Sequence, residues 1–97
     1  INLELEQRGN EASFLKDLSR LRLSLLLISE NEIDEVREIL NKNFIFFEEL
    51  KYEFLGDAEL KSSNQEAAKK NYETALELTS SEIHKELIKI KLSSIIN

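Results

Sequence analysis

The stretch from Leu50 to Leu78 places large and small residues at the spacing expected of two antiparallel helices in close contact. The polar turn Ser62-Ser63-Asn64 divides the stretch into two helical halves. A glycine inside a helix costs roughly 1 kcal/mol relative to alanine. We therefore expect Gly56 to lie where the second helix approaches too closely for a side chain, with an aromatic ring filling the remaining space. The residues expected to make this contact are Tyr52, Leu55, Gly56, Ala68, Tyr72 and Ala75.

Composition favours a single all-helical domain. The 97 residues include no proline and only two glycines, and no cysteine is present for disulfides or thiolate metal sites. No apolar run reaches the roughly 18 residues that a membrane span needs. Because the sequence opens on Ile1 rather than methionine, we expect a fragment, in which any signal or anchor of the full-length protein would be missing.

Acidic residues are concentrated in the middle of the chain. The net charge is -6, and the segment 30–59 holds ten acidic residues against three basic ones. Such a field repels phosphate backbones, which argues against nucleic-acid binding. The segment is either a solvated helical surface or a docking surface for a basic partner.

Apolar periodicity and turn residues predict about five antiparallel helices joined by short loops. Residues 1–10 are expected to be a tail or the end of an upstream helix, because Gly9-Asn10 is typical of a helix end. Three capping-box patterns begin at Ser29, Ser63 and Thr79. The predicted helices are 11–29, 32–40, 44–61, a fourth ending at Leu78, and a last one that opens after the third capping box.

The Leu50–Leu78 pattern resembles the tetratricopeptide repeat (TPR), which has a Leu-Gly pair followed by Ala, an aromatic residue and Ala. An offset of 32 residues aligns Leu23-Ser24 with Leu55-Gly56 and suggests a degenerate copy upstream. We therefore divide the chain into a tail (1–10), a degenerate TPR-like unit (11–43), a TPR unit (44–79) and a C-terminal capping helix (80–97).

Over residues 11–97 the chain is similar to a narrower family, the TPR-like domain of the bacterial ancillary SecYEG translocon subunit. The resemblance rests on the segments 17–23, 55–60, 67–76 and 87–93, which begin Asp17-Leu18-Ser19-Arg20, Leu55-Gly56-Asp57, Ala67-Ala68-Lys69 and Leu87-Ile88-Lys89. It implies a periplasmic module of an inner-membrane protein that contacts the Sec translocon or a periplasmic chaperone, with a membrane anchor outside this fragment. The alternative is a generic cytoplasmic TPR adaptor unrelated to secretion.

Partners of TPR units bind mostly along the first helix of each pair. By the alignment above, the candidate partner-binding residues are Leu18, Leu21, Leu25 and Ile28 in the first unit and Glu53, Asp57 and Leu60 in the second. Because Glu53 and Asp57 are acidic, this surface is unsuited to clamping a peptide carboxylate. The leucine stripe of the first unit has three open interpretations: core covered by other segments, a groove for a client segment, or a homodimer interface.

Residues that could support catalysis or cofactor binding are sparse. His84 is the only histidine, and we expect it to have a surface or packing role. Neither glycine has a second glycine nearby for a phosphate loop, and the acidic residues lack calcium-loop spacing. The aromatic segment Phe44–Phe47 is expected to open the third helix and to be buried against the second, although a contiguous aromatic edge for a partner is the alternative. The sequence predicts no enzyme, cofactor or metal, and a protein partner instead.

Overall fold

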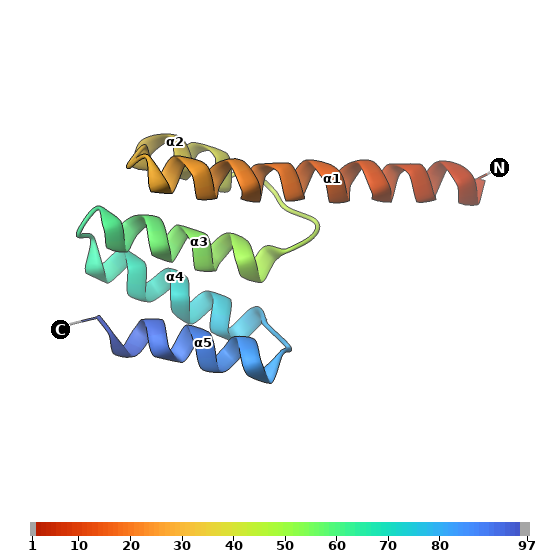
Figure 1. Ribbon diagram of the computed structural model, residues 1–97. Helices are drawn as coiled ribbons and strands as arrows, with labels where there is room; N and C mark the ends of the chain where they lie inside the picture. Colours follow the sequence, from red (N-terminus) through yellow and green to blue (C-terminus); the bar gives the residue numbers. More distant parts are fainter. Residues whose placement is uncertain (1, 96–97) are drawn as a thin grey trace.

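Five helices follow one another and pack as antiparallel neighbours (Figure 1). The computed structural model describes the backbone of residues 2–95 and the side chains of residues 7–95. The helices are α1 (Asn2–Ser29), α2 (Ile33–Leu40), α3 (Glu48–Lys61), α4 (Gln65–Leu78) and α5 (Glu82–Ser93). The predicted all-α class is confirmed, and the described residues contain no strand. Residues 1, 96 and 97, which belong to the predicted tail and capping helix, lie outside the described part of the chain.

Helix α1 continues through the position where the sequence predicts a helix end. A glycine that ends a helix takes a left-handed conformation, but neither Gly9 nor Gly56 has a positive φ. A single helical glycine costs only about 1 kcal/mol, which the rest of a 28-residue helix tolerates. The predicted boundary at Gly9-Asn10 is therefore wrong, and the described part of the predicted tail is the first third of α1. This part of α1 projects beyond the other helices (Figure 1).

The segment Phe44–Phe47 does not open the third helix, which begins at Glu48. Asp17, buried on α1, accepts hydrogen bonds from the backbone N–H groups of Ile45 and Phe46, both at 2.9 Å. Phe47 then takes a left-handed conformation with φ of 62°. These two N–H groups would lack an intrahelical acceptor even in the first turn of a helix, so their bonds to Asp17 hold the segment against α1 without excluding a helix. The left-handed Phe47 interrupts the backbone before Glu48, and the predicted start at Phe44 is wrong for that reason.

Two loops end in side-chain caps, each at a different residue from the one predicted. Asn64 caps α4 by accepting from the Ala67 N–H, and Ser81 caps α5 by accepting from the His84 N–H. The sequence predicts capping by Ser63 and Thr79, respectively one and two positions earlier. Each cap contributes about 0.5–2 kcal/mol. The clusters of polar residues therefore predicted the positions of these two loops correctly, but not which polar residue caps the helix that follows.

The core consists of two clusters that meet at Tyr52. The first cluster joins α1, α2 and α3, and the second joins α3, α4 and α5. Buried members of the first are Leu21, Leu27, Ile33, Val36, Leu40, Leu55 and Ala58. Buried members of the second are Ala68, Tyr72, Ala75, Ile88 and Ile95.

Gly56 and Tyr72 form the close approach between α3 and α4 that the sequence pattern predicts. A Cβ atom built on Gly56 would lie 2.6 Å from both Cδ1 and Cε1 of the Tyr72 ring. The ring itself is almost fully buried. The absence of a side chain at position 56 is therefore what allows α4 to lie against α3.

Candidate partner-binding surfaces

The burial of the two helix pairs follows the 32-residue offset read from the sequence. Ser24 is fully buried on α1, as Gly56 is buried on α3. The equivalent of Tyr72 is Leu40 on α2, which is also fully buried. Both pairs therefore place a small residue on the first helix and a large one on the second, and positions in α1 and α3 can be compared one by one.

Most of the predicted leucine stripe lies against other helices. Leu21 is only 3% exposed and belongs to the first core cluster, and Ile28 is partly buried against the same cluster. Leu18 is half-buried, whereas Leu25 is 49% exposed. The stripe is not a continuous open groove, because α3 packs along the side of α1 that carries Leu21. As a partner-binding residue Leu21 is corrected to a core residue.

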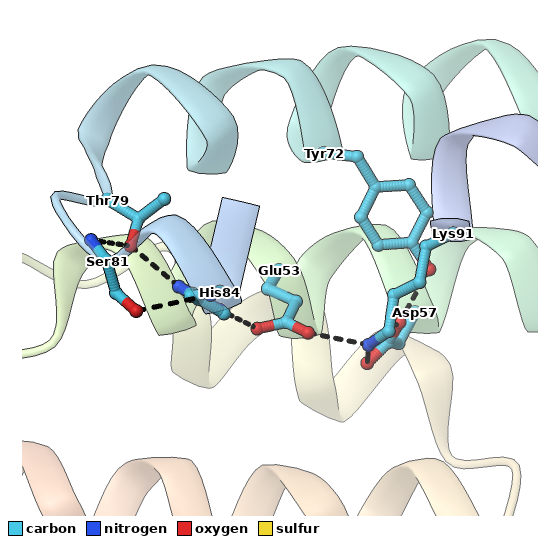
Figure 2. Close-up of polar contacts among 7 residues, drawn as sticks. All are labelled: Glu53, Asp57, Tyr72, Thr79, Ser81, His84 and Lys91. Carbon is cyan, nitrogen blue, oxygen red and sulfur yellow. Dashed lines mark hydrogen bonds and ion pairs between the residues drawn. The ribbon is translucent and has the colours of Figure 1, made fainter. Parts of the chain in front are cut away.

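Glu53 and Asp57 bind α5 of the same chain (Figure 2). Lys91 of α5 places its Nζ 2.7 Å from Glu53 Oε2 and 3.0 Å from Asp57 Oδ1. The Nε2 atom of His84 lies 2.7 Å from Glu53 Oε1. On the other side, the Tyr72 hydroxyl donates to Asp57 Oδ1 at 2.5 Å. The two carboxylates are therefore not an open acidic surface, which corrects the prediction that they face a partner.

These contacts shift the ionisation of the groups involved. Burial alone would raise the pKa of Glu53, but its hydrogen bonds with Lys91 and His84 outweigh burial and lower that pKa. Burial alone would lower the pKa of Lys91, but its bonds to Glu53 and Asp57 raise it. Burial and the bond to Asp57 together raise the pKa of Tyr72. The ionic and hydrogen-bonded contacts thus favour the charge states in which α5 is bound to α3.

Sequence reasoning missed this network because its members are far apart in the chain. His84 and Glu53 are separated by 31 residues, and Lys91 and Glu53 by 38. His84 also places its Nδ1 atom 2.8 Å from Thr79 Oγ1 (Figure 2), so it packs between the α4–α5 loop and α3. Leu60, the remaining predicted contact of the second unit, is partly buried against the second core cluster. The network therefore holds α5 in place, buries Glu53 and leaves Asp57 and Leu60 partly covered.

An exposed apolar surface does exist, on the side of α1 that points away from the core. Leu15, Leu23 and Leu26 are 60%, 45% and 55% exposed. With Ser19 they occupy one side of the helix, because successive residues turn by about 100°. We call Leu15, Ser19, Leu23 and Leu26 the α1 leucine face. The sequence-based site missed it, although the 32-residue offset pairs Leu23 and Leu26 with the buried Leu55 and Ala58.

Three further features of the described residues bear on the kind of site they could form. Within residues 7–95, no three His, Cys, Asp or Glu side chains are grouped to hold a metal ion. Every buried side-chain nitrogen or oxygen of the described part has a hydrogen-bond partner. None of the described helices combines the length and apolar character needed to cross a membrane.

Comparison with protein families agrees with the observed architecture. A family model described as a tetratricopeptide repeat-like domain matches residues 2–97. The chain belongs to this TPR-like family. Neither a curated protein nor a solved structure matches it. Domains of this family are generally non-catalytic modules for protein interaction, which makes the exposed leucines of this TPR-like chain the surface of interest.

Proposed function

We propose that this TPR-like domain is a non-catalytic module that binds a protein partner through the α1 leucine face. The observation that carries the proposal is the exposure of three leucines on one side of a helix whose other side is core. On a soluble protein, a contiguous exposed apolar surface is typical of an interaction site. In α3 the equivalent side is buried against the α1–α2 pair, so the scaffold is built to use this side for helix contacts.

We further propose that the module acts outside the cytoplasm, on an inner-membrane protein that assists the Sec translocon and periplasmic chaperones. Support comes from the segments that resemble the ancillary translocon subunit, among them 17–23 on α1 and 87–93 on α5. The alternative is a cytoplasmic TPR adaptor without a role in secretion. A stretch of about 20 apolar residues upstream, flanked by Lys or Arg on its cytoplasmic side, would favour the envelope protein.

Site-specific cross-linking in the native cell tests both proposals. A photo-activated cross-linker is placed at Leu26 on the α1 leucine face and, as the control, at Ile83, which is 77% exposed on α5. We expect translocon subunits or periplasmic chaperones to be captured from position 26 and not from position 83. Equal capture from both positions contradicts the binding surface. Capture of cytoplasmic proteins alone contradicts the location.

A further inference from the structure

We infer that the α1 leucine face takes an acidic amphipathic helix of a partner protein, packed against α1 as α2 packs against α3. This inference rests on the proposed function and adds the chemistry of the partner to it. Two observations carry it: the burial pattern of the two units and the charges that border the leucine face.

The repeat supplies the geometry. Leu55 and Ala58 on α3 are 6% and 0% exposed because they pack in the cluster that contains α2. Their equivalents on α1 are Leu23 and Leu26, about half exposed. A side of a helix that is buried in one unit and open in the other is a position for a further helix. The contact expected at α1 therefore continues an interface already formed inside the domain.

Helix α2 shows what kind of helix fits such a position. Its apolar residues Ile33, Val36 and Leu40 are all buried. Its remaining surface is rich in acid, with Asp34, Glu35 and Glu38 exposed. By analogy with α2, the expected occupant is a short amphipathic helix with carboxylates beside an apolar row.

The charges of α1 favour the same kind of helix. Lys16 and Arg22, both exposed, border the leucine face on opposite sides, and the exposed Arg8 continues it toward the N-terminal end. Between residues 7 and 29 the only exposed acid is Glu11. A basic border attracts a partner that carries acid at its rim. Two copies of α1 paired through this face would bring like charges together, so the occupant is a different, acidic helix rather than a second copy.

Binding of synthetic helices to the 97-residue chain tests the inference directly. The probe is a stapled helical peptide with leucine and isoleucine at the spacing of Ile33, Val36 and Leu40 and with glutamate on both borders. A matched peptide has lysine in place of every glutamate. We expect the acidic peptide to bind more tightly, and salt to weaken it, because exposed ion pairs are screened.

Two sets of variants locate the binding. Leu23→Ser with Leu26→Ser should weaken the acidic peptide by at least about tenfold, since two buried leucines are lost. Lys16→Glu with Arg22→Glu should remove or reverse the preference between the peptides, by about two- to fivefold for each charge. Leu87→Ser, which changes a 52% exposed leucine of α5, is the matched control and should leave binding unchanged. Circular dichroism of each variant should show unchanged helix content.

Each outcome decides the inference. Equal binding of the two peptides, or binding that survives the double leucine change, overturns it. A dimer in sedimentation that disappears in the double leucine variant assigns the face to a second copy and also overturns it. If the peptides fail to bind while cross-linking at position 26 captures a translocon subunit or a periplasmic chaperone, the proposed function stands and the acidic helix is rejected.

Discussion

Replacing Gly56 with alanine tests the contact that most constrains this fold. The added Cβ would lie 2.6 Å from two ring atoms of Tyr72, whereas carbon atoms in contact prefer about 3.5–4.0 Å. The ring must retreat by about 1 Å, yet it is almost fully buried and its hydroxyl is held by Asp57. The retreat therefore strains both the packing and the hydrogen bond.

Opposing effects set the magnitude of this change. Overpacking costs about 1–3 kcal/mol and a weakened hydrogen bond about 1 kcal/mol. Replacing a helical glycine returns about 1 kcal/mol. We expect Gly56→Ala to lower the free energy of unfolding by about 2 kcal/mol, and Tm by roughly 8–16 °C for a domain of this size. Urea and thermal denaturation followed by circular dichroism measure both quantities.

A matched glycine supplies the control. Gly9 is also helical, but a Cβ there would meet nothing within 4 Å. Gly9→Ala should therefore leave stability unchanged or raise it, by up to about 1 kcal/mol. If both alanine variants are stabilised, the close approach of α3 and α4 does not limit the side chain at position 56, and the reasoning is refuted.

A double-mutant cycle examines the same contact from the other side. By the 32-residue offset, the buried Ser24 and Leu40 of the first unit correspond to Gly56 and Tyr72 of the second. Tyr72→Leu makes the large partner smaller, so it should reduce the cost of Gly56→Ala by about 1 kcal/mol or more. Strictly additive effects would mean that these two residues do not limit each other.

Three further measurements test the polar contacts. Asp17→Ala removes the acceptor of two backbone N–H groups, so we expect a loss of about 2–4 kcal/mol in urea denaturation. The control Glu11→Ala, at an exposed position, should change stability by less than about 0.5 kcal/mol. In acid, the lowered pKa of Glu53 contributes stability that is present above its ordinary value of 4.5 and lost as pH falls through the folded value, so the acid loss should shrink in Glu53→Gln. In alkali, the raised pKa values of Tyr72 and Lys91 contribute stability that is present below pH 10.0 and lost as pH rises further. A stability curve of Tyr72→Phe with the same alkaline slope as the wild type would contradict the last expectation.

Local pattern predicted the parts of the fold that depend on neighbours in the sequence. The α3–α4 pair was predicted because Leu55-Gly56 and Ala68, Tyr72 and Ala75 repeat at helical spacing, and the structure buries all five. The loops after α3 and α4 were predicted from clusters of polar residues. The capping residues themselves were not predicted, because several adjacent polar residues could cap each helix. Asn64 caps α4 and Ser81 caps α5.

The two wrong helix boundaries have different causes. Phe44–Phe47 has helical composition, but Phe47 takes a left-handed conformation, and Asp17 holds the backbone of the segment from 28 and 29 residues away along the chain. Gly9 lacks the positive φ of a helix-ending glycine, and α1 continues through it because one helical glycine costs only about 1 kcal/mol. The first error reflects a contact between distant segments, and the second reflects a local signal that the rest of the helix overrides.

The candidate site divides in the same way. The leucines around α1 predicted either an interaction surface or a core, and the packing of α2 and α3 against α1 leaves Leu21 buried and Leu26 exposed. The acidic residues predicted a charged surface, but in the folded chain α5 places Lys91 against Glu53.

Residue spacing and residue size are enough to predict a stack of helix pairs built around Gly56 and Tyr72, because both can be read along the chain. Which side of each helix is open follows only from the folded arrangement. It depends on the packing of segments that are not neighbours in the chain, such as α1 with α3 and α3 with α5. The exposed leucines of α1 are therefore a property of the folded arrangement, read from a repeat that the sequence had already revealed.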